Sequence, residues 1–244
     1  MNLKLNLSFI LFLLFLNCSI IYPTKKPIDT VYFITGKDQS KNLIIMLPGR
    51  GDKPDDYKKN GFIESIINSG VDSDVIVVDA HVGYYYNQNL IPRLYEDVIA
   101  PSRLKGYKNI WMLGISIGGI GTLLYAQKHP DSLNGIVLLA PFLGDEEIIN
   151  EINFNGGLLK WTPKEPISVD DYQRSLWLWL KKYSNPKHTL PKLILGYGQD
   201  DKFALSNKFL SEVLPVNQVY VLQGDHDWDT WNRLFNRFLK DKFL

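Results

Sequence analysis

Seven short runs of consecutive apolar residues divide most of this chain, and segments of helical periodicity lie between them. Residues that are apolar at successive rather than alternate positions are typical of strands buried on both faces of a sheet. Repeated strand-helix units predict an α/β fold with a mostly parallel central sheet and helices on both faces. We expect the strands at residues 30–35, 43–47, 75–78, 110–113, 136–139, 193–195 and 219–222.

The length and composition predict one globular domain. The chain has 244 residues, of which 45% are hydrophobic, and this is enough to bury a full core without a second domain. We assign the domain to residues 29–244 and expect a small helical insertion, which forms a partial lid, at 142–190. Residues 19–28 are interpreted as a short polar linker.

The first 18 residues are predicted to be an export signal and not part of the domain. Lys4 precedes an apolar run at 9–16, which is shorter than the ~20 residues needed to span a bilayer. Cys18, the only cysteine, follows this run after Asn17, and the arrangement resembles the junction of bacterial lipoproteins, where the cysteine is lipidated. We therefore expect an exported protein, either a membrane-anchored lipoprotein or a secreted or periplasmic one. An ordinary cleaved signal and an uncleaved anchor are the alternatives.

A serine between two glycines lies where a strand is predicted to turn into a helix. Gly114, Ser116 and Gly118 form a G-x-S-x-G pattern directly behind the apolar run 110–113, and a helical pattern begins after it. A tight turn that projects the serine hydroxyl leaves no room for Cβ atoms beside it and requires unusual φ and ψ, so glycine is needed there. In this context the pattern is typical of a nucleophile elbow.

Three other predicted strands end in loops that carry reactive or hydrogen-bonding groups. The second strand leads into a glycine-bracketed loop around Arg50, the sixth leads to Asp200 and Asp201, and the seventh leads to His226. In an open α/β sheet, ligands bind at the carboxyl ends of the strands. These side chains are therefore expected near Ser116, and their order along the chain is serine, aspartate, histidine.

From residue 43 to the C-terminus, the motifs resemble the α/β-hydrolase superfamily, in particular its serine esterases and lysophospholipase-like members. That family places its nucleophile in G-x-S-x-G, its acid in a G-x-x-D loop after a later strand, and its histidine last, in a G-x-H context. The resemblance implies Ser116 as nucleophile and His226 as base. It implies Asp201 as the acid, in preference to Asp200.

The chemistry of these groups supports the same roles. A serine hydroxyl is a poor nucleophile until an imidazole takes its proton, and a carboxylate on the other ring nitrogen holds the useful tautomer. The resemblance further implies an oxyanion hole formed by the backbone N–H groups of Ile117, directly after the serine, and of Arg50, after a Pro-Gly pair. We expect a serine hydrolase that cleaves carboxylic esters through an acyl-enzyme. A thioesterase, a peptidase, an acyltransferase and a non-catalytic surface lipoprotein on the same scaffold are the alternatives.

Charge and histidine spacing argue against several other classes of function. Lys and Arg together number 27 against 26 Asp and Glu, and no basic run stands out, so nothing indicates a nucleic-acid partner. No pair of the four histidines has metal-ligand spacing. We expect no metal and no cofactor, and a small-molecule ester as substrate. The oligomeric state stays open.

The remaining candidates have structural interpretations beside functional ones. His81 follows the third predicted strand and is a candidate pocket residue. Within the insertion, Trp177 falls off the helical stripe and is a candidate for lining an acyl pocket, and the small lid favours short to medium acyl groups. Asp225 and Asp227 flank the histidine and are expected to cap the last helix.

Overall fold

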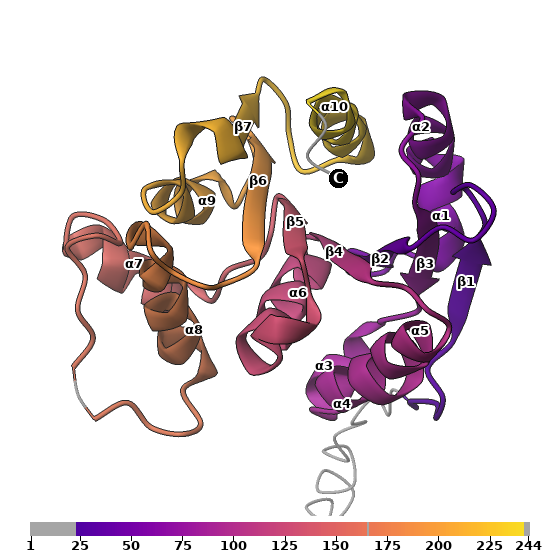
Figure 1. The fold of residues 1–244 in the computed structure, drawn as a ribbon. Coiled ribbons are helices and arrows are strands. Elements are labelled where there is room, and N and C mark those ends of the chain that lie inside the picture. Colours follow the sequence, from indigo (N-terminus) through magenta and orange to yellow (C-terminus); the bar gives the residue numbers. More distant parts are fainter. Residues whose placement is uncertain (1–22, 165, 242–244) are drawn as a thin grey trace, which may run out of the picture.

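The computed structural model describes residues 23–164 and 166–241, and its centre is a seven-stranded sheet (Figure 1). The strands lie in the order β1-β3-β2-β4-β5-β6-β7, and every neighbouring pair is parallel except β1 with β3. The predicted mostly parallel sheet is confirmed. The strands are β1 (Thr30–Phe33), β2 (Asn42–Leu47), β3 (Asp74–Val78), β4 (Asn109–Ile115), β5 (Gly135–Leu139), β6 (Lys192–Gly198) and β7 (Val219–Leu222).

All seven strands lie where the apolar runs predicted them. β1 ends two residues earlier than expected, and β4 and β6 extend furthest beyond their predicted bounds. β4 and β6 continue through glycine-containing segments, to Ile115 and Gly198. In the register of the parallel ladder, Leu47 of β2 pairs with Gly114 of β4, and Gly198 of β6 pairs with Leu222 of β7. The carboxyl ends of these strands therefore share one edge of the sheet, and the loops that follow them meet there.

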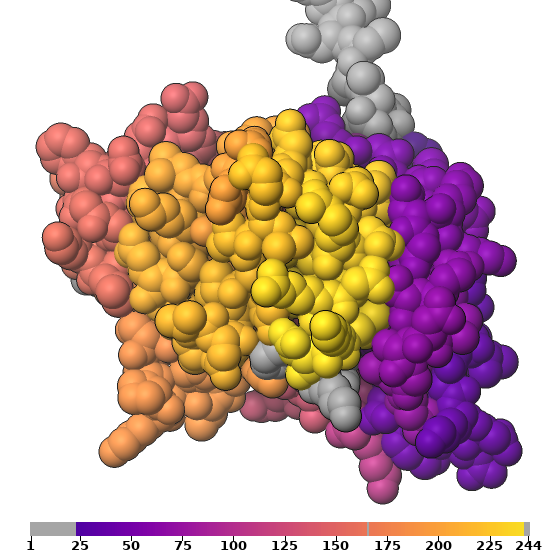
Figure 2. All heavy atoms as spheres, turned by 90° about the horizontal axis from the view of Figure 1, so that it is seen from above, coloured from indigo at the N-terminus to yellow at the C-terminus, as the bar shows by residue number. Residues whose placement is uncertain are grey.

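Helices cover both faces of the sheet, as the strand-helix alternation predicts. In Figure 1, α1, α2 and α10 lie on one side of the strands, and α3 to α6 lie on the other. Figure 2 looks onto the first side and shows the yellow C-terminal part, which includes α10, between orange segments that precede it in the chain and the purple N-terminal part, in agreement with contacts between α10 and α2. The helices are α1 (Pro54–Lys59), α2 (Phe62–Ser69), α3 (Val82–Tyr86), α4 (Leu90–Arg93), α5 (Ala100–Leu104), α6 (Ile117–Lys128), α7 (Glu146–Phe154), α8 (Tyr172–Lys181), α9 (Ala204–Ser211) and α10 (Trp228–Lys240).

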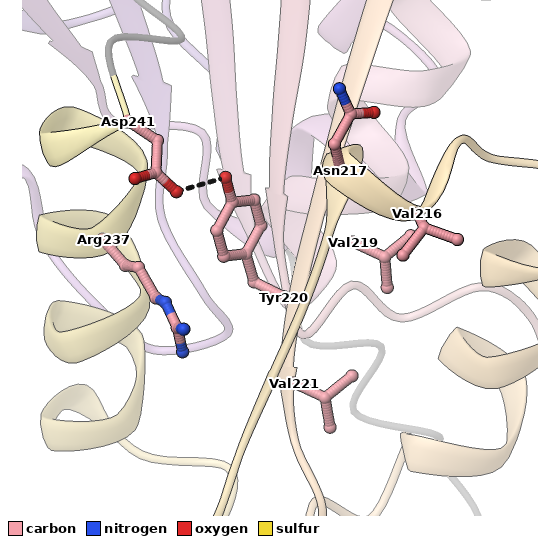
Figure 3. Close-up of a pocket in the computed structure, with 7 residues that line it drawn as sticks. All are labelled: Val216, Asn217, Val219, Tyr220, Val221, Arg237 and Asp241. Atoms are coloured by element: carbon pink, nitrogen blue, oxygen red, sulfur yellow. Dashed lines mark hydrogen bonds between the residues drawn. The ribbon is translucent and has the colours of Figure 1, made fainter.

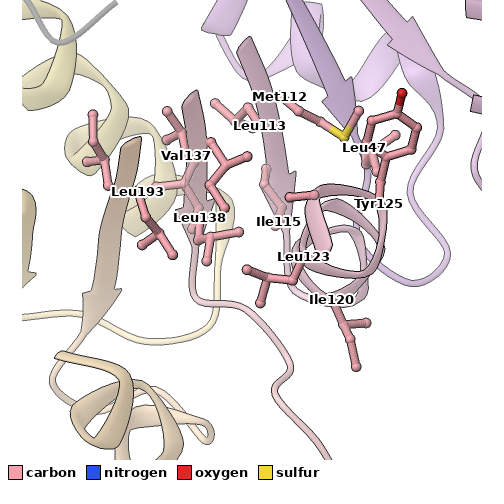
Figure 4. Close-up of a cluster of buried hydrophobic side chains, with 14 of the residues drawn as sticks. Leu47, Met112, Leu113, Ile115, Ile120, Leu123, Tyr125, Val137, Leu138 and Leu193 are labelled. Carbon is pink, nitrogen blue, oxygen red and sulfur yellow. The ribbon is translucent and has the colours of Figure 1, made fainter. Parts of the chain in front are cut away.

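The hydrophobic core lies along the central strands beneath α6. Figure 4 shows Ile115 of β4, Leu138 of β5 and Leu123 of α6 in this cluster, and all three are fully buried. Helix α6 begins directly at the end of β4, so its position is set by the same core that buries β4. Burying a side chain of this size stabilises the fold by about 1.5–3 kcal/mol. The core thereby holds the turn between β4 and α6 in place.

The segment 142–190 contains α7 and α8, and it is packed more tightly than an open lid would be. Trp177 of α8 is fully buried, and so are its neighbours Leu176 and Leu180. The prediction that Trp177 lines an acyl pocket is therefore wrong, because α8 packs beside α6 and buries a wider arc of its surface than the sequence stripe indicated. Arg174 of α8 forms ion pairs with Glu147 and Glu151 of α7, which tie the two helices together.

The predicted export signal at 1–18, with Cys18, lies outside the described residues. Within the described part of the chain, no helix combines the length and apolar character needed to cross a membrane.

Candidate active site

Ser116 lies in a strained turn between β4 and α6. Its φ is 52° and its ψ is −116°, a conformation that costs a non-glycine residue on the order of 1–3 kcal/mol. A Cβ atom on Gly114 would lie 2.2 Å from the carbonyl oxygen of Gly118, and one on Gly118 would lie 2.2 Å from that of Leu47. The glycines are needed because backbone occupies the space of their side chains, as the nucleophile-elbow pattern predicted.

The three side chains that the sequence predicted to converge are hydrogen-bonded in a row. Nε2 of His226 lies 2.9 Å from Oγ of Ser116, and Nδ1 of His226 lies 2.7 Å from Oδ2 of Asp201. The Asp201 side chain is completely buried, whereas the His226 side chain is 12% exposed and Ser116 retains 8% exposure. The carboxylate is thus shielded from water, and the hydroxyl and imidazole lie at the boundary with solvent.

The structure brings Asp201, and not Asp200, to the imidazole. The second oxygen of Asp201, Oδ1, accepts a 2.7 Å hydrogen bond from the backbone N–H of Phe203, which fixes the orientation of the carboxylate. Asp200 is exposed and accepts a hydrogen bond from the side chain of Gln223. The two adjacent carboxylates therefore face different neighbours, although the residues follow one another in the loop after β6.

Two aromatic rings flank the imidazole edge-on, and sequence reasoning did not assign them to the site. The ring centroids of Phe203 and Trp231 each lie 5.0 Å from that of His226, at interplanar angles of 86° and 87°. Trp231 belongs to the apolar stripe of α10, which is typical of core packing, so no sequence signal singled it out. Phe203 follows Asp201 by two positions, and that proximity to the predicted acid was the available clue.

The two backbone N–H groups predicted to form the oxyanion hole, those of Ile117 and Arg50, lie on adjoining turns. Ile117 is the first residue of α6, where backbone N–H groups lack intrahelical acceptors and the helix dipole favours negative charge. Arg50 lies in a turn closed by the 3.2 Å hydrogen bond from Asp52 N–H to Gly49 O, in which Gly51 adopts a φ of +89°. Because Gly118 packs directly on the carbonyl of Leu47, this turn adjoins the elbow. The Arg50 side chain is exposed.

Comparison with solved structures identifies the fold of this protein. The fluorophosphonate-binding serine hydrolase FphF from Staphylococcus aureus superposes with a TM-score of 0.62 at 17% identity, over 89% of this chain and 94% of that one. Est1E from Butyrivibrio proteoclasticus superposes with a TM-score of 0.59 at 17% identity, over 88% and 95% of the two chains. The protein has the α/β-hydrolase fold.

Sequence comparisons agree with this fold over part of the chain. The family model described as "Serine aminopeptidase, S33" matches residues 93–171 of this α/β-hydrolase domain. An acetyl esterase from Caldicellulosiruptor saccharolyticus is 27% identical over 137 residues, which are 49% of this chain and 49% of the relative. The match therefore spans about half the length of that curated relative.

Other candidate residues of the α/β-hydrolase domain have structural partners. Nδ1 of His81 accepts a hydrogen bond from the backbone N–H of Gly83 and so caps α3. Asp227 caps α10, since its carboxylate accepts the N–H of Thr230 at 2.8 Å. Asp225 instead accepts the backbone N–H of His226, so the expectation that both aspartates cap the last helix holds for Asp227 alone.

Two surface cavities of the α/β-hydrolase domain lie away from the hydrogen-bonded triad. One, of about 480 Å³, lies between β7 and the C-terminal end of α10 and is lined by residues that include Tyr220 and Arg237 (Figure 3). Another, of about 430 Å³, lies at the amino ends of β2 and β4, beside Trp111. Neither is lined by Ser116, Asp201 or His226. Within residues 23–164 and 166–241, no group of three or more His, Cys, Asp or Glu side chains is placed to hold a metal ion.

Proposed function

We propose that this protein is a serine hydrolase that cleaves carboxylic esters through an acyl-enzyme. The observation that carries the proposal is the row of hydrogen bonds from Ser116 through His226 to the buried carboxylate of Asp201, at the carboxyl edge of the sheet. The α/β-hydrolase fold and the partial match to an acetyl esterase support it. Metal and nucleic-acid partners have no part in the proposed reaction.

The proposed reaction has two steps, formation of the acyl-enzyme and its hydrolysis, and the same imidazole transfers the proton in both. His226 Nε2 takes the hydroxyl proton of Ser116 as its Oγ attacks the ester carbon, and the ring then gives that proton to the departing alcohol. Water then attacks the acyl-enzyme, and the same imidazole takes a proton from it and returns that proton to Oγ of Ser116 as the bond between Oγ and the acyl group breaks and the acid is released. The amides of Ile117 and Arg50 are proposed to bind the negative oxygen, where losing one donor typically costs about 3 kcal/mol of transition-state stabilisation.

We propose short to medium acyl groups as the preferred substrates. The ring centroids of Phe142 and Phe203 lie 5.4 Å apart beside the elbow, and the backbone N–H of Phe142 donates a hydrogen bond to the carbonyl of Ser116. Two aromatic side chains therefore lie close to the reacting serine. The insertion buries Trp177 in the core instead of opening an acyl channel. A long acyl chain is therefore proposed to have little space near the hydroxyl.

Peptide hydrolysis is a second candidate, because the matching family model is described as a serine aminopeptidase. The same triad would attack an amide, and the leaving group would be an amine that takes its proton from the imidazole. A thioesterase or an acyltransferase would also use the same groups. These activities differ in the acyl bond and the acceptor, so a substrate panel separates them.

The deciding experiment is labelling with a fluorophosphonate probe, followed by turnover of p-nitrophenyl acetate, p-nitrophenyl palmitate and an aminoacyl p-nitroanilide. We expect the wild type to be labelled and to hydrolyse the acetate fastest, and Ser116→Ala to lose both properties. Ser65→Ala, on α2, is the matched control and should behave as wild type. If the wild-type protein is not labelled, the proposal of a serine hydrolase fails and a non-catalytic role of the same scaffold is favoured. If the anilide is cleaved faster than the esters, the peptidase is favoured.

We also propose that the protein is exported through residues 1–18 and retained at a membrane by lipid on Cys18. The support is the sequence pattern alone. Mass spectrometry of the protein expressed in a bacterium should find a mature chain that begins at lipidated Cys18, and Cys18→Ser should abolish the modification. A full-length, unmodified chain in the cytoplasm would contradict both parts of the proposal.

A further inference from the structure

A buried asparagine outside the triad lies between two loops of the candidate site. Asn207 is near the beginning of α9 and is fully buried. Its Nδ2 group donates one hydrogen bond to the carbonyl of Phe203, at 2.8 Å, and another to the carbonyl of Pro141, at 3.4 Å. Phe203 is in the acid loop, residues 199–203, which carries the triad aspartate, and Pro141 is in the loop after β5, residues 140–145. The side-chain amide therefore connects these two loops.

The loop after β5 is held against the nucleophile turn. The backbone N–H of Phe142 donates a 2.9 Å hydrogen bond to the carbonyl of Ser116. Pro141 packs on the start of α6, since a Cβ atom on Gly119 would lie 2.5 Å from the Cβ atom of the proline. Ala140 has a φ of +44°, a conformation that persists in a residue other than glycine only where neighbouring contacts hold it. A shift of this loop would therefore move the backbone that carries the nucleophile.

The acid loop holds the other end of the triad. Oδ1 of Asp201 accepts the backbone N–H of Phe203 at 2.7 Å, and Oδ2 of Asp201 faces Nδ1 of His226. The ring of Phe203 lies edge-on to the imidazole, and its centroid is 5.4 Å from that of Phe142. Phe203 thus contacts the acid, the base and the loop after β5, and its carbonyl accepts the amide of Asn207.

The polar atoms of Asn207 indicate that an amide is present for its donors. Its Oδ1 is buried and has no hydrogen-bond partner among the described residues. A buried polar atom without a partner costs free energy, so an apolar side chain of similar shape would fill the space at less cost. The carbonyl of Phe203 also accepts the backbone N–H of Asn207 and the hydroxyl of Ser206. The contact that the amide adds is therefore the one to Pro141, across to the other loop.

We propose that Asn207 is a positioning residue that couples the acid loop to the loop after β5 and so keeps Asp201 aligned with Ser116 during ester hydrolysis. This inference rests on the proposed function. The imidazole transfers the proton only while its hydrogen bonds to the acid and to the serine are both aligned, and small displacements of reacting groups lower the rate steeply. Because Asn207 is fully buried, it does not touch the substrate. Loss of its donors therefore affects the transition state more than substrate binding.

The variants that test this are Asn207→Leu and Asn207→Ala. Leucine is branched at the same carbon as asparagine, and it removes both donors together with the unpaired Oδ1. Alanine removes the same donors without adding bulk. Ser206→Ala is the matched control, because Ser206 is the neighbouring buried residue and its hydroxyl donates at 2.9 Å to the carbonyl of Phe203. This control removes a hydrogen bond within the acid loop and leaves the connection to the other loop in place.

The measurements are kcat and KM for p-nitrophenyl acetate, the second-order rate constant of fluorophosphonate labelling, and the melting temperature. Rates are referred to the amount of protein that is labelled at the end point. We expect both Asn207 variants to lower kcat and the labelling rate constant about tenfold, with KM changed less than about twofold. The melting temperature of Asn207→Leu should stay within about 4 °C of wild type, since removal of the unpaired oxygen offsets the lost hydrogen bonds. Ser206→Ala should keep the rates of wild type.

A purely structural role of Asn207 would give the opposite pattern. The inference is overturned if the Asn207 variants react as fast as Ser206→Ala, or if they lose melting temperature while the labelled protein keeps the wild-type kcat. If Asn207→Leu does not fold, the rates of Asn207→Ala decide. If neither variant folds, Asn207 is a structural residue and the inference fails.

Fluorophosphonate labelling keeps this test separate from the proposed substrate. If wild type is labelled but cleaves no ester, the ester proposal fails, while the labelling rate constants of the Asn207 variants still judge the positioning role. If wild type cleaves the ester and the Asn207 variants match it, the positioning role alone fails. If wild type is not labelled, both proposals fail.

Discussion

Nδ1 of His226 lies 2.7 Å from Oδ2 of Asp201, and the side chain of that aspartate is completely buried. An ionised carboxylate only accepts hydrogen bonds, so this contact places the ring proton on Nδ1. Nε2 is then left with a free lone pair 2.9 Å from the hydroxyl of Ser116. The buried acid thereby sets which nitrogen of the ring is able to act as base, and this relationship leads to the first prediction.

Replacing Asp201 by asparagine should remove the hydrogen-bond acceptor that selects the Nδ1–H tautomer. In a serine, histidine and aspartate triad such a change lowers kcat on the order of 10⁴-fold while the fold persists. We expect a loss of that size for Asp201→Asn with p-nitrophenyl acetate. Asp200→Asn is the matched control, and its kcat should stay within about twofold of wild type because an exposed residue contributes little. A greater loss at Asp200 than at Asp201 would reverse the assignment of the acid.

Gly118→Ala should destabilise the elbow. The added Cβ atom would lie 2.2 Å from the carbonyl oxygen of Leu47 and 2.7 Å from that of Pro48, so backbone must shift to admit it. We expect the free energy of unfolding, measured by urea titration, to fall by about 1–3 kcal/mol, as for other overpacked sites. Lys128→Ala, at the exposed end of the same helix, should change it by less than about 0.5 kcal/mol. Equal effects of the two changes would contradict the steric argument.

Asp227 should contribute to stability as the N-cap of α10. Its carboxylate accepts the N–H of Thr230, and this hydrogen bond is the main reason why the pKa of Asp227 lies below its ordinary value. Asp227→Ala should lower the free energy of unfolding by about 1 kcal/mol, whereas Asp227→Asn should be nearly neutral, because asparagine caps as well as aspartate. Thermal unfolding of both variants at pH 7 checks this, and an alanine variant as stable as the asparagine one would exclude a capping role.

The ion pairs of Arg174 should make the insertion sensitive to acid. A hydrogen bond from Arg174 lowers the pKa of Asp171, and at Glu151 burial is outweighed by hydrogen bonds from Arg174 and Trp161, so its pKa is lowered as well. A carboxyl whose folded-state pKa is lowered contributes stability above its unfolded pKa and loses it as the pH falls through the folded value. Wild type should therefore lose this contribution below about pH 4.

Arg174→Gln isolates that effect. We expect the variant to be less stable than wild type at pH 7 and the difference to shrink as the pH falls below about 4, because the carboxyls are then protonated in both proteins. Lys187→Gln removes one positive charge from the same insertion at an exposed residue and should show no such trend. A stability difference that stays constant from pH 7 to pH 3 would show that Arg174 acts through packing and not through its ion pairs.

The strands and the elbow could be predicted from the chain because their signals are local. A run of consecutive apolar residues is favoured between two layers, and the five inner strands are buried in this way, whereas β1 and β7 at the edges of the sheet are only partly buried. The edge position of β1 and its antiparallel pairing with β3 had no such signal, since pairing partners depend on the arrangement of the whole sheet. Trp177 shows the same limit, because its burial depends on how α8 packs beside α6.

In the candidate site, too, some features follow from local sequence and others only from contacts between distant segments. The amino-acid sequence by itself determined where the nucleophile turn lies and in which order serine, aspartate and histidine follow, because glycine spacing and strand ends are properties of neighbouring residues. Only the tertiary structure decided that Asp201 faces the imidazole and that Phe203 and Trp231 flank it. These contacts connect residues far apart in the chain, so they exist only once the strands are ordered and in register.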